Sequence, residues 1–163
     1  MIVLGIDPGI AIVGYGIIEY TGNNFKLLDY GVITTKSNLA YPERLEIIFN
    51  RLNQIMTSFN IDEIAIEELF FSKNVKTAIS VAQARGVIVL SAQLNTKPIY
   101  EYTPLQVKQG VSGYGKADKR QVQEMVKILL NLKSIPKPDD AADALAIAIS
   151  HCHTSKFSEM FRA

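Results

Sequence analysis

The spacing of hydrophobic positions changes several times along this chain, and each change predicts a new element. Val3–Ile6 is a short apolar run that ends at Asp7-Pro8-Gly9, which predicts a buried strand followed by a turn. Two more strands are expected over Gly14–Tyr20 and Phe25–Thr34, with a hairpin turn at Thr21–Asn24 between them. The chain is therefore expected to open with an antiparallel meander.

A helical period of apolar residues begins after Pro42, and strands and helices then alternate. The expected elements are a helix from Pro42 to Phe59, a strand over Ile61–Glu68, a long apolar helix over Val75–Leu94, a strand over Pro98–Tyr102, a helix that starts at Asp118, and a last helix from Pro138 to about His151. This order predicts one α/β domain over residues 1–153, with a mixed sheet flanked by helices, and residues 154–163 as a C-terminal tail.

Composition narrows the class of protein. The chain has 163 residues, of which 48% are hydrophobic and 20% charged, as expected of a globular domain. Its one cysteine, Cys152, cannot form an internal disulfide or a multi-cysteine zinc site. The uninterrupted apolar runs are shorter than a membrane span needs, and the N-terminus lacks the basic region of a secretion signal. We therefore expect a cytoplasmic protein without a membrane span.

Charge is unevenly distributed along the chain. The formal net charge is only +1, but residues 1–68 carry a net charge of −5 and residues 69–137 a net charge of +8. A basic region beside an acidic one suits a polyanion-binding surface next to a cation site. Ordinary solvated helix faces would produce the same counts, so charge by itself leaves both interpretations open.

Carboxylates stand at the ends of three separate elements. Asp7 ends the first strand, Glu67 and Glu68 end the fourth, and Asp140 and Asp143 share a face at the start of the last helix. Helix capping explains an isolated acid of this kind but explains the whole set less well.

Small residues on the strands favour a close approach of the last helix. Gly5 lies on the strand face of Asp7, and Ala65 on that of Glu67, because strand side chains alternate. This favours Glu67 over Glu68 and predicts that Asp7, Glu67, Asp140 and Asp143 converge. All-oxygen ligands suit Mg²⁺ or Mn²⁺, and two such ions support phosphodiester hydrolysis.

Six short motifs resemble the bacterial RuvC crossover junction endodeoxyribonucleases. They are GIDPG at 5–9 with GYG at 14–16, AIE at 65–67, QARG at 83–86, QVKQ at 106–109 and DAADALA at 140–146. They occur in order from residue 2 to about 153. Val13 departs from the Thr or Ser of many members, and residues 154–163 extend beyond the usual end.

The resemblance implies a fold, an activity and a set of partners. It implies a ribonuclease H-like fold with a five-stranded mixed sheet, and a homodimer that resolves Holliday junctions in recombination and repair. Cleavage would use two Mg²⁺ per subunit, replaceable by Mn²⁺, and would make paired symmetric nicks with 5′-phosphate and 3′-hydroxyl ends. The RuvAB branch-migration motor is the implied partner. The family's catalytic and metal-binding carboxylates fall on Asp7, Glu67, Asp140 and Asp143, and some members have histidine at the position of Asp140.

DNA contacts are expected from the basic middle region. The family's DNA-contacting lysines fall on Lys108 and Lys119, and its junction-centre aromatic falls on Phe70. The full expected set is Phe70, Lys73, Arg85, Lys108, Tyr114, Lys116, Lys119 and Arg120. Tyr114 and Lys116 belong to a glycine-rich segment that matches phosphate-loop spacing but has Ala117 in place of the hydroxyl residue, so we interpret it as a mobile DNA-contacting loop.

Several further interpretations accompany this hypothesis. The apolar helix Val75–Leu94 is either buried in the monomer or a dimer interface. His151-Cys152-His153 is interpreted as a plain helix terminus. The rival functions are an RNA or hybrid nuclease of the same fold, a non-catalytic junction-binding protein, and an actin- or sugar-kinase-like protein, which would need about twice this length.

Overall fold

The computed structural model describes residues 1–69, 75–154 and 162, and it has one five-stranded sheet. The elements in chain order are β1 (Ile2–Asp7), β2 (Ile12–Thr21), β3 (Asn24–Thr34), α1 (Tyr41–Phe59), β4 (Glu63–Glu67), α2 (Val75–Leu94), β5 (Ile99–Tyr102), α3 (Pro104–Ser112), α4 (Lys119–Leu129) and α5 (Asp139–Thr154). The strand order is β3-β2-β1-β4-β5, with β1–β2 and β2–β3 antiparallel and β1–β4 and β4–β5 parallel. The predicted mixed sheet flanked by helices is confirmed.

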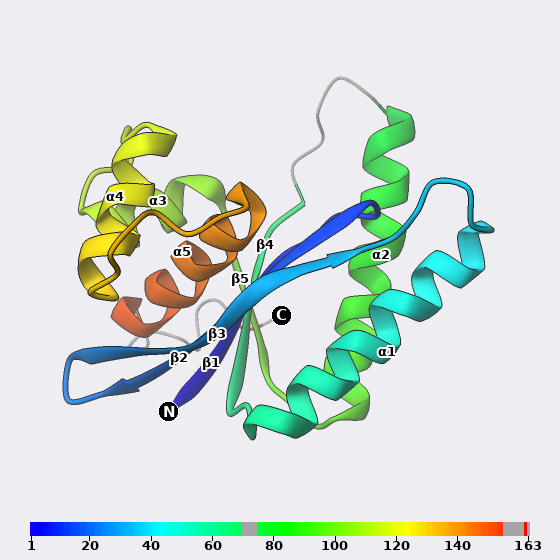
Figure 1. Cartoon of the computed structure of the whole chain (residues 1–163), viewed down its shortest axis with the longest axis horizontal. Coiled ribbons are helices and arrows are strands. Elements are labelled where there is room, and N and C mark those ends of the chain that lie inside the picture. The colour runs from blue at the N-terminus through cyan, green and yellow to red at the C-terminus, as the bar shows by residue number, and fades with distance from the viewer. Residues whose placement is uncertain (70–74, 155–161, 163) are drawn as a thin grey trace.

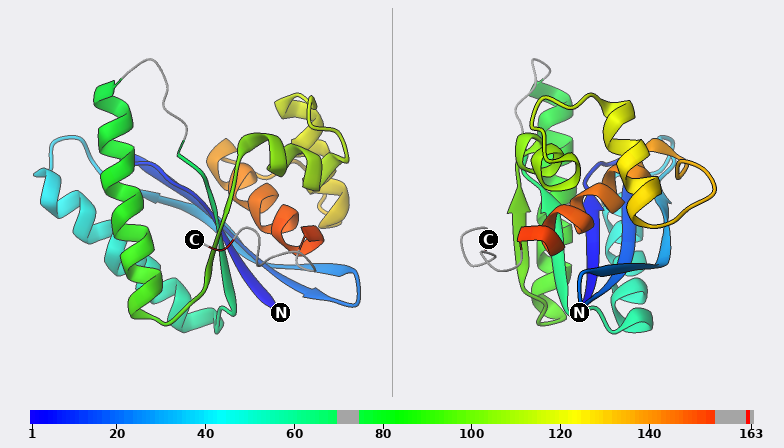
Figure 2. Two further views of the ribbon diagram at one scale, coloured as in Figure 1. Left: turned by 180° about the vertical axis from the view of Figure 1, so that it is seen from behind. Right: turned by 90° about the vertical axis from the view of Figure 1, so that its left-hand side faces the viewer.

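Helices cover both faces of the sheet (Figures 1 and 2). Helices α1 and α2 pack on one face, and α3, α4 and α5 lie on the other. Alternation along the strands separates the two cores, because Leu4 and Ile64 pack toward α1 and α2, whereas Val3 and Ala65 pack toward α5. Asp7 has the strand parity of Val3, so it belongs to the α5 side of the sheet.

Local signals in the sequence mark several boundaries correctly. Gly22 and Asn23 have φ of 54° and 68°, the positive values that a tight hairpin between twisted strands requires. Asp118 caps α4 as predicted. Its carboxylate accepts a hydrogen bond from the Gln121 backbone at 2.8 Å, and the Gln121 side chain accepts one from the Asp118 backbone at 2.9 Å.

Helix α3 was not predicted, and it replaces part of the expected loop. Thr103 caps it, Pro104 occupies its first turn, and the Gln106 side-chain oxygen accepts a hydrogen bond from the Thr103 backbone N–H at 2.7 Å. Gly110 lies within α3, and a Cβ there would overlap Ser150 of α5. This glycine therefore permits helix packing instead of belonging to a mobile loop, and α3 leaves Tyr114 and Lys116 in the short turn before α4.

The expectation about membrane spans needs a correction in α2. The window Thr77–Leu94 is long and apolar enough to qualify as a candidate span, with a mean hydropathy of 1.2, and 28% of it is buried. Counting uninterrupted apolar runs overlooked this window because polar residues such as Gln83 and Arg85 divide it. One helix that meets criteria of length and composition is weak evidence for a span.

Candidate active site

A flat patch of small residues on the sheet receives helix α5. Gly5 pairs with Gly16 of β2 and with Ala65 of β4, which places three minimal side chains in one row across three strands. A Cβ at Gly5 would overlap the carbonyl oxygen of Ala144, and one at Gly16 would overlap Leu145. The helix backbone therefore rests directly on the sheet, as the small residues predicted.

The strand register brings Asp7 and Glu67 to the same edge of this patch. Strands β1 and β4 are parallel, and the residues from Val3 to Ile6 each pair with the residue 60 positions later, ending with Ile6 and Ile66. Continuing this register by one residue puts Asp7 level with Glu67. Glu68 is exposed and outside the pocket described below, so its position differs from that of Glu67.

Helix α5 supplies the other two carboxylates, Asp140 from its first turn and Asp143 from the next. A Cβ at Gly14 would overlap the carbonyl group of Asp140, so the first turn lies on β2 at Gly14. Gly14 is also the residue that pairs with Asp7. The structure therefore places Asp140 beside Asp7, and Asp143 follows one turn further along α5, above the same edge of the sheet.

The negative charges of neighbouring carboxylates affect the pKa values of Asp7, Glu67 and Asp143. Burial raises the pKa of Asp7 to about 7, and the negative charges of Glu67, Asp143 and Asp140 contribute to this increase. Burial likewise raises the pKa of Glu67 and of Asp143. The positive charge of Lys119 acts in the opposite direction on all three groups.

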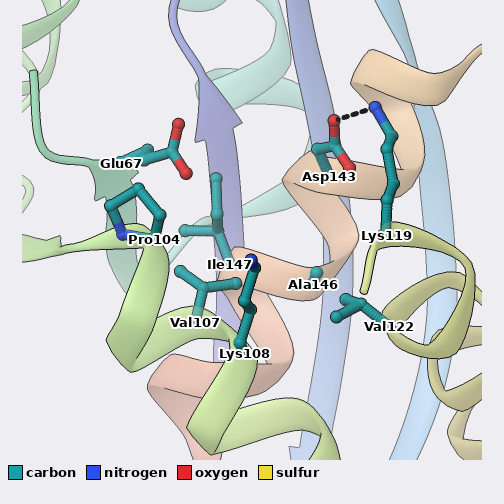
Figure 3. A pocket seen from close by; sticks show the side chains of 9 residues that line it. All are labelled: Glu67, Pro104, Val107, Lys108, Lys119, Val122, Asp143, Ala146 and Ile147. Carbon is teal, nitrogen blue, oxygen red and sulfur yellow. Dashed lines mark hydrogen bonds and ion pairs between the residues drawn. The ribbon is translucent and has the colours of Figure 1, made fainter. Parts of the chain in front are cut away.

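Glu67 and Asp143 face a common pocket of about 290 Å³ (Figure 3). Its lining residues are Glu67, Pro104, Val107, Lys108, Lys119, Val122, Asp143, Ala146 and Ile147. Strand β4 and helices α3, α4 and α5 contribute to the walls, so four segments that are distant in sequence meet here. Lys108 and Lys119, two of the expected DNA contacts, both line this pocket.

Lys119 is the cation that the carboxylates already attract. Its Nζ donates a hydrogen bond to Asp143 Oδ2 at 3.0 Å and lies 3.5 Å from Asp139 Oδ2. Within the described ranges, no three Asp, Glu, His or Cys side chains lie close enough to enclose a metal as they stand. The donor set nevertheless fits a divalent cation, because it is all oxygen and already attracts the ammonium group of Lys119.

The other expected DNA contacts are distributed more widely. Tyr114, Lys116 and Arg120 are exposed on and before α4, and Arg120 pairs with Glu124 at 2.8 Å. Arg85 lies on α2, on the opposite side of the sheet, in an ion pair with Glu101 of β5, and its side chain is only 20% exposed. The structure thus does not bring Arg85 to the carboxylates. Phe70 and Lys73 lie outside the described residues.

His151 lies in the last turn of α5, as predicted, but it also belongs to a buried network that the interpretation as a plain helix terminus did not include. The ring is fully buried; its Nδ1 lies 2.6 Å from the Tyr102 hydroxyl and its Nε2 lies 2.5 Å from Glu63 Oε2. His153 is exposed, by contrast, and its Nδ1 lies 2.6 Å from the Gly110 carbonyl oxygen. The sequence carried no signal for this network, because its members are separated by up to 88 positions.

Comparison with known proteins agrees with this geometry. The profile of the family described as Crossover junction endodeoxyribonuclease RuvC matches residues 3–151. The chain belongs to this family.

Relatives and solved structures of the RuvC family match nearly the whole chain. The RuvC protein of Alkaliphilus oremlandii is 66% identical, over 99% of both chains, and that of Clostridioides difficile is 60% identical, over 99% of this chain and 96% of the other. The structure of T. thermophilus RuvC in complex with a Holliday junction substrate is 35% identical, with a TM-score of 0.95 over 100% of this chain and 99% of that one. The implied ribonuclease H-like fold is therefore confirmed.

Proposed function

We propose that this chain is a structure-selective DNA endonuclease that resolves Holliday junctions in homologous recombination and repair. The observation that carries this proposal is the convergence of Asp7, Glu67, Asp140 and Asp143 at one edge of the sheet, in a member of the RuvC family. Metal-dependent phosphodiester hydrolysis is the chemistry such a carboxylate set supports. The T. thermophilus relative, whose structure was solved with a Holliday junction, supports the choice of substrate.

The four carboxylates would hold the metal. Two Mg²⁺ or Mn²⁺ ions bound there would lower the pKa of the attacking water and stabilise the departing 3′ oxygen, which leaves 5′-phosphate and 3′-hydroxyl ends. Lys108 and Lys119 line the same pocket, so their ammonium groups would bind the phosphate beside the carboxylates. The apolar wall formed by Val107, Val122 and Ile147 limits water around the reacting phosphate.

We further propose that helix α2 forms the interface of a homodimer. Ile79, Leu90 and Leu94 are 55%, 53% and 63% exposed on this helix, whereas Ala84, Ile88 and Ala92 of the same helix are buried in the core on that side of the sheet. A two-fold interface here would cover these side chains and would provide two active sites for paired symmetric nicks. Gly86 lies on the same helix with open space around its α-carbon, which permits close helix approach.

The remaining proposals concern the organisation of the chain and its setting. Residues 1–153 form the nuclease domain, and residues 154–163 are a tail, of which Arg162 makes an isolated bridge with Tyr100 of β5. The family membership supports a cytoplasmic location and a RuvAB-type motor as the partner that delivers junctions.

Cleavage of a synthetic four-way junction tests the proposed activity. The protein is mixed with a labelled junction and Mg²⁺, beside linear duplex and RNA–DNA hybrid controls. We expect symmetric nicks on the junction alone. Glu67→Gln should lower the cleavage rate by about 10³-fold, because a metal ligand contributes several kcal/mol to the transition state. The matched control Glu68→Gln changes an exposed carboxylate one residue away and should retain the rate.

Each rival predicts a different result. Preferential cleavage of the hybrid would support an RNA or hybrid nuclease of the same fold. Junction binding without cuts, in wild type and Glu67→Gln alike, would support a non-catalytic junction-binding protein. Equal losses in Glu67→Gln and Glu68→Gln would remove the argument that the pocket contains the reacting groups.

A further inference from the structure

Lys119 lies between two carboxylates that have different environments. Its Nζ is 3.0 Å from Asp143 Oδ2 and 3.5 Å from Asp139 Oδ2. Asp143 lines the active-site pocket together with Lys119, whereas Asp139 does not. Asp139 also accepts a hydrogen bond from Lys137 Nζ at 2.8 Å, at the edge of the site that faces solvent.

The helix geometry explains how one ammonium reaches both acids. Asp139 and Asp143 are four residues apart on α5, so their side chains stand one turn apart on the same face. Lys119 is the first residue of α4, directly after the cap Asp118, which fixes the start of this helix opposite α5. The ammonium therefore already lies within ion-pair distance of both carboxylates.

We propose that Asp139 is a positioning residue for Lys119, an inference that rests on the function proposed above. A divalent cation and Lys119 compete for Asp143, because both need its carboxylate. When a cation takes Asp143, Asp139 accepts the displaced ammonium and keeps it at the rim of the pocket. Without Asp139 the cation would have to displace Lys119 with no neighbouring anion to receive it.

The hypothesis predicts a measurable loss of cation affinity. In Asp139→Asn, the dissociation constant for Mn²⁺ should rise by about two- to fivefold, the range expected for one exposed ion pair. Asp139→Glu keeps a carboxylate on the same face and should restore affinity to near the wild-type value. The thermal unfolding midpoint should be the same for all these proteins, because the Asp139 side chain is 45% exposed.

A double-mutant cycle separates this role from a general charge effect. Asp139 adds negative charge near the site, and this charge by itself would attract a cation. In the Lys119→Met background there is no ammonium to receive, so Asp139→Asn should have little further effect on Mn²⁺ affinity. Equal effects of Asp139→Asn in the presence and absence of Lys119 would show that Asp139 acts only through its charge, and would overturn the proposal.

The experiment measures free Mn²⁺ by electron paramagnetic resonance, with full-length protein and no DNA. The four proteins of the cycle, Asp139→Glu and Asp143→Asn are titrated under the same conditions. An Asp139→Asn affinity equal to or tighter than wild type would also contradict the proposal. Junction cleavage by the wild type is measured in parallel, and failure to cleave would reject the proposed function. Cleavage together with independent effects of Asp139→Asn and Lys119→Met on Mn²⁺ affinity would reject only the role of Asp139.

Discussion

At the scale of single residues, Asp7 is a candidate functional group that lowers the stability of the folded chain. Its carboxylate is buried beside three other acids, and its pKa in the folded chain is about 7, against 3.8 when unperturbed. A carboxyl group whose pKa is raised in the folded state holds its proton more tightly there than in the unfolded chain. Deprotonation therefore favours the unfolded chain and lowers the free energy of unfolding. This cost is absent below about pH 4, grows as the pH rises, and reaches its full value above about pH 7.

Asp7→Asn should therefore stabilise the metal-free protein at high pH. The shift in pKa corresponds to an upper limit of about 4 kcal/mol in the free energy of unfolding at pH 8. The gain should be small at pH 4, close to the unperturbed pKa of 3.8, because Asp7 is still partly protonated in the unfolded chain there. Urea unfolding of the wild type and Asp7→Asn at pH 4 and pH 8, with a chelator present, measures the difference in their free energies of unfolding. A stabilisation of equal size at both pH values would contradict the assignment to ionisation.

At the scale of elements, the packing of α5 on the sheet determines where the carboxylates of this helix lie. Asp140 and Asp143 reach Asp7 only because α5 rests on Gly5, Gly14 and Gly16. A Cβ at any of these three glycines would meet a backbone atom of the helix, which cannot rotate away as a side chain can. The position of the helix, and with it the geometry of the carboxylates, thus depends on the absence of a methyl group.

Gly5→Ala should displace α5 and separate the carboxylates. We expect a loss of about 1–3 kcal/mol in the free energy of unfolding, together with weaker Mn²⁺ binding, because the new Cβ overlaps Ala144 and Ala148. Gly86→Ala in the Leu90→Arg background, where the proposed α2 interface is already disrupted, is the comparison. The added methyl group meets open space in a helix there and should stabilise that chain by about 0.5–1 kcal/mol. Urea unfolding and Mn²⁺ titration test both, and unchanged cation affinity in Gly5→Ala would disprove this dependence.

Helix α2 offers a second prediction at this scale. Leu90→Arg places a charge in the proposed dimer interface and should give a monomer, with the fold retained because Leu90 is already exposed. Ile128→Arg changes a similarly exposed residue, 64% accessible, on α4 and should leave the dimer intact. Sedimentation equilibrium distinguishes the two. A monomeric wild type, or dissociation of both variants, would reject the interface on α2.

At the scale of the whole molecule, His151 joins three elements in one buried network. Glu63 belongs to β4, Tyr102 to β5 and His151 to α5, so the network ties the end of α5 to the far strands of the sheet. Burial lowers the pKa of His151 and raises that of Tyr102 to about 12. The Tyr102 hydroxyl therefore donates to a neutral imidazole, whose other nitrogen donates to Glu63.

This network should lose stability in acid. The unfolded chain binds a proton at His151 near pH 6.5, before the folded chain does, so the stabilising contribution is present above pH 6.5 and decreases as the pH falls below it. Asp7 has the opposite dependence, so the measurement uses the Asp7→Asn background. There, His151→Gln should flatten the pH dependence of the unfolding free energy between pH 5 and 6.5. An unchanged slope would show that His151 does not titrate in this range.

The sequence by itself determined the elements and the candidate acids. Periodicity and caps depend on residues a few positions apart, so the antiparallel meander, the cap at Asp118 and the long helix Val75–Leu94 were predicted close to their observed bounds. Helix α3 was missed because nine residues hold too few periods, although Thr103 and Gln106 already carried its capping signal. Gly5 and Ala65 also predicted where α5 would pack, since strand alternation is a local rule.

Only the tertiary structure decided which side chains meet. Asp7 and Glu67 become neighbours through the register of two parallel strands 60 residues apart, and Lys119 reaches Asp143 because α4 packs near α5. Arg85, one of the expected DNA contacts, pairs with Glu101 of β5 on the face of the sheet opposite the carboxylates. Such pairings depend on packing between distant segments, which local patterns do not encode. The sequence therefore named the chemical groups, and the packing of the sheet and helices determined their partners.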